Sequence, residues 1–96
     1  MKIIVKGYFT LKNAMDGQSV LELEKETASI REILDDLSCR FGKGLTDLII
    51  DPETGELVRH VMLLVNGLNY LYLPNMLDAP LKNGDVIALF PPIAGG

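Results

Sequence analysis

The chemistry suggested by this sequence lies in its last residues, "PPIAGG", which end on two glycines. Gly96 bears the terminal carboxylate, and neither Gly95 nor Gly96 has a Cβ, so this end can pass through a channel too narrow for other side chains. A carboxylate is a poor electrophile until one of its oxygens is converted into a leaving group. We therefore expect Gly96 to be activated by another protein, and the tail to act as a carrier arm. The plain alternative is a fraying chain end without chemistry.

Two prolines form the base of this arm. Pro91 and Pro92 both fix φ, Pro92 also biases Pro91 toward an extended conformation, and neither can donate to a sheet. The preceding strand must therefore end there. Residues 91–96 are predicted to form a flexible tail that could project about 18 Å at roughly 3.1 Å per residue. We expect disorder from Ile93 onward.

Other polar residues are weaker candidates. Cys39 should lie about 180° from Ile30 around an ideal helix, near solvent, which favours an incidental thiol. His60 is the only histidine, and no Cys, His or carboxylate cluster has ligand spacing, so no metal site is expected. No nucleophile and base pair, phosphate-binding loop or paired catalytic carboxylates can be proposed. We therefore expect a non-enzymatic protein with no bound cofactor.

Composition narrows the class of protein. The chain has 96 residues, of which 48% are hydrophobic, and a formal charge of -4 from 13 acidic and nine basic residues. These values predict a single folded domain over residues 1–96, disfavour nucleic acid as a partner, and are compatible with a basic protein surface. The single Cys39 and the absence of a charged leader disfavour secretion. With no apolar run long enough to span a bilayer, we expect a soluble cytoplasmic protein and no membrane partner.

The elements that must position the tail can be read from apolar periodicity. Residues 2–9 predict a first strand, with Ile3, Val5 and Phe9 on one face and Tyr8 on the other. The turn-forming "NAMDGQ" leads to "SVLELE", so the first two strands should form an antiparallel hairpin. Two further strands are predicted over residues 61–65 and 86–90, separated by mostly turns.

One helix is predicted with more detail. Apolar residues follow a single stripe at helical spacing, namely Ile30, Ile33, Leu34, Leu37 and Phe41. Ser29 is placed as N-cap, Glu32 completes a capping box, and Gly42 suits the helix end. The order strand, strand, helix, strand, turns, strand predicts an α+β fold in which a mixed sheet clasps one main helix. This is the β-grasp, or ubiquitin-like, arrangement.

A docking surface on two strands is one of two readings that the sequence leaves open. The strand over residues 61–65 is apolar on both faces, so Met62, Leu64, Ile87 and Leu89 could form an exposed patch for a partner. The alternative is that residues 45–50 cover them. Phe90 has two readings as well, because it could close the core or lie at the rim of the docking patch.

The segments "LKNGDVIALFPPIAGG" and "VNGLNY", on this order of elements, resemble the MoaD/ThiS sulfur-carrier family, and most closely its molybdopterin synthase small-subunit (MoaD) branch. The resemblance implies that the C-terminal glycine is adenylated with ATP by a MoeB-like enzyme related to ubiquitin-activating enzymes, and receives sulfur from a donor protein as a thiocarboxylate. The tail then enters the MoaE-like large subunit of molybdopterin synthase, where the sulfur builds the molybdopterin dithiolene of the molybdenum cofactor.

Matched by motif, Gly96 would carry the sulfur and Gly95, Ala94 and Ile93 would thread the channel, while the docking base would be Phe90, Pro91 and Pro92. The paired prolines favour the molybdopterin branch over the thiamin branch. The longer connection "LTDLIIDPETGELVRH" departs from the shortest family members. Carriers for tRNA thiolation or tungsten-pterin synthesis therefore stay open, as do a ubiquitin-like protein modifier and a plain interaction domain.

Overall fold

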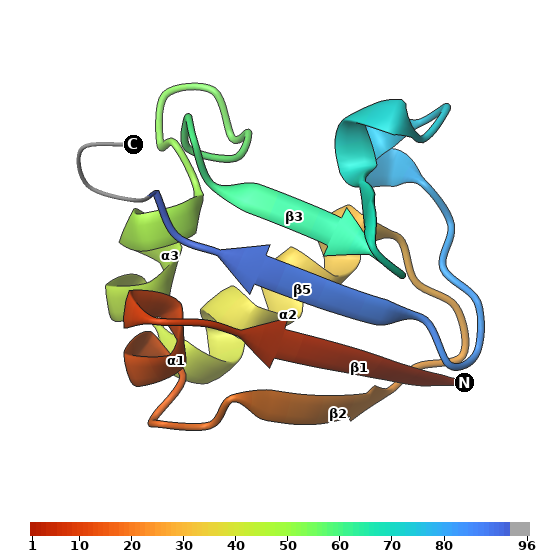
Figure 1. Ribbon diagram of the computed structural model, residues 1–96, viewed down its shortest axis with the longest axis horizontal. Coiled ribbons are helices and arrows are strands. Elements are labelled where there is room, and N and C mark those ends of the chain that lie inside the picture. The colour runs from red at the N-terminus through yellow and green to blue at the C-terminus, as the bar shows by residue number, and fades with distance from the viewer. Residues whose placement is uncertain (93–96) are drawn as a thin grey trace.

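The computed structural model describes residues 1–92 and contains a five-stranded mixed sheet in the order β2-β1-β5-β3-β4 (Figure 1). The strands are β1 (Lys2–Gly7), β2 (Val20–Glu24), β3 (Met62–Val65), β4 (Leu68–Asn69) and β5 (Val86–Phe90). Central β1 and β5 run parallel, and the other pairs are antiparallel. The fold is a ubiquitin-like β-grasp, as the sequence predicted.

The first hairpin forms in the predicted sense, but β1 is shorter than expected. Ile3 lies opposite Leu23 and Val5 opposite Leu21, and all four side chains are buried. The strand ends at Gly7, two residues early, because the chain turns at Phe9 into a short helix, α1 (Thr10–Ala14), which the sequence reading missed. Phe9 is therefore 68% exposed and does not share the buried face of β1, which corrects its predicted place.

The main helix, α2 (Ile30–Phe41), matches its prediction at both ends. The Glu32 backbone N–H donates to the Ser29 hydroxyl at 3.2 Å, and the Ser29 N–H donates to the Glu32 carboxylate at 3.1 Å. Gly42 ends the helix with φ 75°, a left-handed value that suits glycine. The stripe is buried except for Phe41, which is partly exposed, and Cys39 is exposed as expected.

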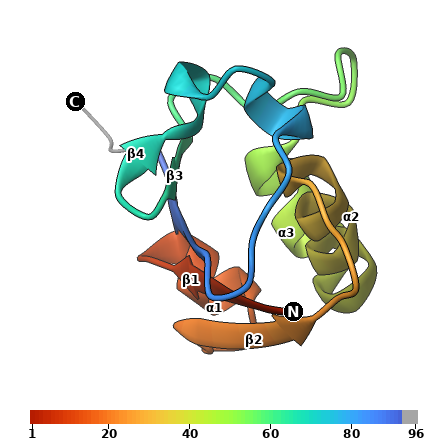
Figure 2. The same ribbon diagram turned by 90° about the vertical axis from the view of Figure 1, so that its right-hand side faces the viewer.

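A third helix, α3 (Lys43–Ile49), follows at once and was not predicted. Leu45 and Ile49, four residues apart, are fully buried, so this helix adds a second support to the core. Figure 2 shows α2 and α3 on the same side of the sheet. After α3, a turn over residues 51–56 is closed by hydrogen bonds between Asp51 and both Gly55 and Glu56.

The connection from β3 to β5 is mostly turns, as predicted, and holds β4 and two short 3₁₀ helices, η1 (Tyr70–Tyr72) and η2 (Met76–Asp78). Leu77, Ala79 and Leu81 from this connection are buried in the same apolar core as the strands and helices. The Arg31 guanidinium of α2 binds the Asp78 carboxylate at 2.9 Å and the Glu56 carboxylate at 3.6 Å. These ion pairs join α2 to η2 and to the loop over residues 51–56.

Candidate docking surface and tail base

β5 delivers the chain to the base of the tail. Phe90 is the last residue of the strand and lies opposite Met62 of β3. The strand ends before Pro91 and Pro92, as their missing N–H groups require. Pro91 is buried and Pro92 is exposed, so the described chain stays packed on the domain through Pro91.

The predictions for Ile93, Ala94, Gly95 and Gly96 lie outside the described residues. The threading role, the reach of the tail and the expected disorder therefore stay predictions. What the structure does describe is the surface from which these residues continue.

The register between β3 and β5 divides the residues of the predicted patch between the two faces of the sheet. In an antiparallel pair, directly opposite residues share a face. Leu63 lies opposite Leu89 and Val65 opposite Ile87, and these four side chains are in the buried core. The expectation that Ile87 and Leu89 would be exposed together with Met62 was therefore wrong.

The opposite face carries a different apolar set. Met62 lies opposite Phe90, and Leu64 opposite Ala88. Met62 is 46% exposed and the other three side chains are half-buried. Figure 2 shows α2 and α3 on the other side of the sheet, so neither covers this face. We call the surface formed by Met62, Leu64, Ala88, Phe90 and Tyr8 the outer patch.

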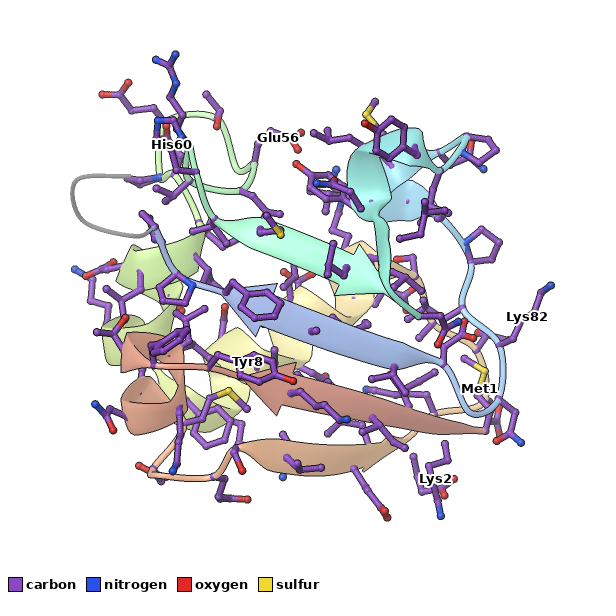
Figure 3. All side chains as sticks on the ribbon, in the orientation of Figure 1. Met1, Lys2, Tyr8, Glu56, His60 and Lys82 are labelled. Atoms are coloured by element: carbon purple, nitrogen blue, oxygen red, sulfur yellow. The ribbon has the colours of Figure 1, made fainter. Side chains whose placement is uncertain are left out.

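Tyr8, the residue after β1, joins the outer patch and was not among the predicted site residues. Its ring stacks on Phe90 with centroids 4.4 Å apart and planes 2° from parallel. The Tyr8 backbone N–H donates to the Leu89 carbonyl at 3.2 Å, which fixes the end of β1 beside the end of β5. Figure 3 shows Tyr8 at this position. The sequence did place Tyr8 on the face opposite Ile3 and Val5, but it could not reveal that Phe90 faces it.

Phe90 thus lies on the outer face and does not close the core. Of its two predicted readings, this position excludes the one in which it closes the core, and the rim of a docking patch stays a prediction. Lys6 of β1 lies beside Ala88 in the pairing with β5, on the same face, and within residues 1–92 it forms no ion pair. The outer patch is therefore an apolar and aromatic surface with one cation at its border.

The groups with perturbed acidity lie elsewhere. Hydrogen bonding to Asp78 raises the pKa of Arg31, with a further contribution from Glu56. Partial burial raises the pKa of Tyr70, and the Glu56 charge acts in the same direction. Arg31 belongs to α2 and Tyr70 to η1, so neither is part of the outer patch.

A hollow of about 600 Å³ lies at the far end of the sheet from the tail base, with Asn66, Leu68 and Asp85 in its lining. Two of its polar side chains already have partners, because the Asp85 carboxylate accepts from the Asn66 amide at 3.0 Å and from the Lys82 N–H at 2.8 Å. Over residues 1–92, no three His, Cys, Asp or Glu side chains are grouped so that they could hold a metal ion. His60 is exposed just before β3.

No helix within the described part of the chain is both long enough and apolar enough to cross a membrane. The arrangement of the described residues suits binding by surface contact. The aromatic pair and Met62 lie beside the end of β5, where the chain leaves the sheet, and Leu64 and Ala88 continue the same face two residues further back along the strands.

Fold and surface together define a small ubiquitin-like protein of the carrier or modifier class. The chain belongs to the ThiS family, whose model matches residues 7–96. It is similar to small archaeal modifier protein 3 of Haloferax volcanii, with 30% identity over 96 residues and complete coverage of both chains. It is also 30% identical over 80 residues to an Archaeoglobus fulgidus protein named as a candidate sulfur carrier, covering 83% of this chain and 88% of that protein.

Solved structures agree with this assignment. The crystal structure of small archaeal modifier protein 1 (SAMP1) from Haloferax volcanii matches with a TM-score of 0.81 and 26% identity over the whole of both chains. The structure of the BexX/CysO complex from Amycolatopsis orientalis matches with a TM-score of 0.77 and 27% identity, covering 98% of this chain and 99% of the other. Members of this family therefore include proteins that work with partner proteins.

Proposed function

We propose that this protein is a sulfur carrier and the small subunit of a molybdopterin synthase. Gly96 is adenylated with ATP by a MoeB-like enzyme, converted to a thiocarboxylate with sulfur from a donor protein, and delivered to a MoaE-like large subunit for dithiolene formation. The observation that carries the proposal is the apolar outer patch beside the tail base in a chain of the ThiS family. The pair Pro91 and Pro92 supports the molybdopterin branch.

The chemistry of activation is supplied by the partner. A Gly96 carboxylate oxygen attacks the α-phosphorus of ATP, and pyrophosphate leaves. Hydrosulfide released by the donor protein then attacks the acyl carbon, the bond from that carbon to the AMP oxygen breaks, and the thiocarboxylate and AMP are the products. This protein contributes the acyl group and the surface that positions it, so it is a substrate of the adenylating enzyme and a non-catalytic subunit of the synthase. We place both roles in the cytoplasm. Its reducing conditions also suit the unpaired thiol of Cys39.

The outer patch explains how two different partners can use one tail. The adenylating enzyme and the large synthase subunit must both accept the residues beyond Pro92, so both must approach the surface around Phe90. Aromatic and long aliphatic side chains contribute most to such contacts. Because the same patch serves both partners, they bind one at a time.

A second candidate function is protein modification. The relative that covers the whole chain is named small archaeal modifier protein 3, which favours this alternative. The first step is the same, but here a lysine amine of another protein attacks the activated Gly96 carbonyl and forms an isopeptide bond. Sulfur delivery to tRNA, thiamin or a tungsten-pterin would likewise share the activation step and differ in the acceptor.

The test begins with ATP–pyrophosphate exchange catalysed by the adenylating enzyme of the same organism. The full chain should support exchange, and a chain that lacks Gly96 should fold equally well but support none. A chain with one additional C-terminal residue, protected from trimming, should also be inactive. If either altered chain supported normal exchange, the carrier proposal would fail and a plain interaction domain would be favoured.

The acceptor is tested next. Thiocarboxylated protein, the large synthase subunit and the pterin precursor should together yield molybdopterin, whereas unmodified protein should not. High-mass conjugates in a lysate that depend on Gly96, without molybdopterin formation, would replace the synthase proposal with the modifier alternative.

A further inference from the structure

Phe9 combines a strained backbone with an exposed aromatic ring. Its φ is 55° and its ψ is -125°, and its side chain is 68% exposed. This backbone conformation is one that glycine dominates in tight turns, and a bulky side chain rarely adopts it. An aromatic residue at this position is therefore unfavourable both for the backbone and for hydration of the ring.

Folding does not explain the side chain of Phe9. The carbonyl of Phe9 accepts hydrogen bonds from Lys12 N–H at 3.1 Å and Asn13 N–H at 3.4 Å, which begins α1, but any residue has that carbonyl. The side chain makes no capping hydrogen bond to α1. Glycine would form the same turn with less strain and without exposing an apolar ring.

The position of Phe9 suggests a use for the ring. Tyr8 stacks on Phe90 and donates its N–H to Leu89, so the next residue lies where the chain leaves β1, level with the end of β5. Figure 3 shows this end of β1 beside β5. Phe9 thus directly follows a residue of the outer patch, and Pro91 directly follows the residue on which Tyr8 stacks, so the backbone of Phe9 lies close to the tail base.

We infer that Phe9 is an anchor residue for the protein that takes up the tail, and that its ring enters an apolar pocket at the mouth of that partner's channel. The inference rests on the proposed function, and it adds Phe9 as the residue that orients the partner as it binds. Aromatic anchors dominate protein interfaces, and strained backbone is concentrated at functional positions. The tight turn holds the ring away from the domain, so a partner binds it with little loss of conformational freedom.

Met76 provides a matched control. It also has a positive φ, 45°, and is 48% exposed, but it begins η2, at the far end of the sheet from the tail base. Figure 1 shows this end, where the connection from β4 to β5 lies, opposite the end of β5. Phe9 and Met76 therefore share a strained backbone and an exposed side chain, but only Phe9 lies close to the tail base.

The experiment compares stability with partner recognition in Phe9→Gly, Phe9→Asn, Phe9→Tyr and Met76→Gly. Relief of strain should raise the Tm of Phe9→Gly by on the order of 4 °C. In ATP–pyrophosphate exchange with the adenylating enzyme of the same organism, the KM for Phe9→Gly should rise at least about tenfold, with kcat unchanged, since binding and not chemistry is affected. Phe9→Asn should behave similarly, whereas Phe9→Tyr should retain the normal KM. Met76→Gly should gain stability without a change in KM.

The outcomes separate this inference from the proposed function. A wild-type chain that supports no exchange overturns the proposed function, and with it this anchor. A wild-type chain that supports exchange while Phe9→Gly and Phe9→Asn keep the normal KM overturns the anchor alone. An equal rise in KM for Met76→Gly would also overturn it, because the effect would then not depend on the position of Phe9.

Discussion

The two faces of the sheet are built from alternating residues of the same strands, yet one face is buried in the core and the other stays partly exposed. Leu63 and Leu89 on the inner face are fully buried in the core. Leu64 and Phe90, each one residue further along, lie on the outer face and keep part of their surface exposed. Apolar character alone therefore does not distinguish a buried leucine from a partly exposed one here, whereas register does. The comparison predicts opposite consequences for neighbouring substitutions.

The largest effect on stability is expected at the inner face. Leu63→Ala should lower the free energy of unfolding by about 2–5 kcal/mol, because the fully buried side chain leaves a cavity that the core cannot fill. Urea denaturation measures this directly. At concentrations where the variant is still folded, its KM in ATP–pyrophosphate exchange should be normal. A loss below about 1 kcal/mol would mean that the inner face is not the core.

The adjacent residue should show the reverse. Leu64→Asp should change the free energy of unfolding by no more than on the order of 1 kcal/mol, since the side chain is only half-buried. The KM in exchange should rise at least about tenfold, because a charge is placed in an apolar contact. Leu71→Asp is the control, since Leu71 is 58% exposed in η1, outside the outer patch. Equal effects of the two substitutions on KM would contradict the docking role of the patch.

The stacked pair on the outer face should contribute a smaller energy. A double-mutant cycle with Tyr8→Leu and Phe90→Leu should give a coupling free energy of about 0.5–1.5 kcal/mol for unfolding. Thermal or urea denaturation of the four proteins measures it. A coupling near zero would indicate that the rings do not stack in solution.

The smallest effect is expected from the ion pairs of α2. Arg31→Gln removes the contacts with Asp78 and Glu56, which are exposed to solvent, so the Tm should fall only slightly. The difference from wild type should shrink when salt is raised to about 1 M, where screening is strong. A large drop in Tm that salt does not alter would mean that these contacts, and not the apolar core, hold η2 in place.

The sequence predicted the fold well where a pattern was both local and long. α2 has five apolar residues in one stripe and a capping box between Ser29 and Glu32, and its bounds agree with the prediction. The short helices α1 and α3 escaped, because five to seven residues give too little periodicity and Gly42 and Gly44 interrupt the second. Their stability depends on burial of Leu11, Leu45 and Ile49, which is a property of the tertiary structure.

The candidate site was predictable in part. The terminal glycines and the two prolines are visible in the sequence, and their chemistry needs no structure to formulate. The outer patch is not visible, because both faces of β3 are apolar and only the register with β5 assigns Met62 and Leu64 to the outside. Phe9 was displaced from its expected face by the early end of β1 at Gly7, whereas Tyr8 kept its predicted face and only its contact with Phe90 was not foreseen. The sequence does not reveal a tight turn of this kind when the residue that makes it is aromatic.

The most direct test of the central claim is the intact mass of the protein after incubation with ATP, a sulfur donor and the adenylating enzyme, with the chain that lacks Gly96 treated in parallel. We expect a mass change equal to one oxygen replaced by sulfur, in the full chain alone. An unchanged mass for the full chain, or the same change in the chain without Gly96, would show that Gly96 does not carry the sulfur.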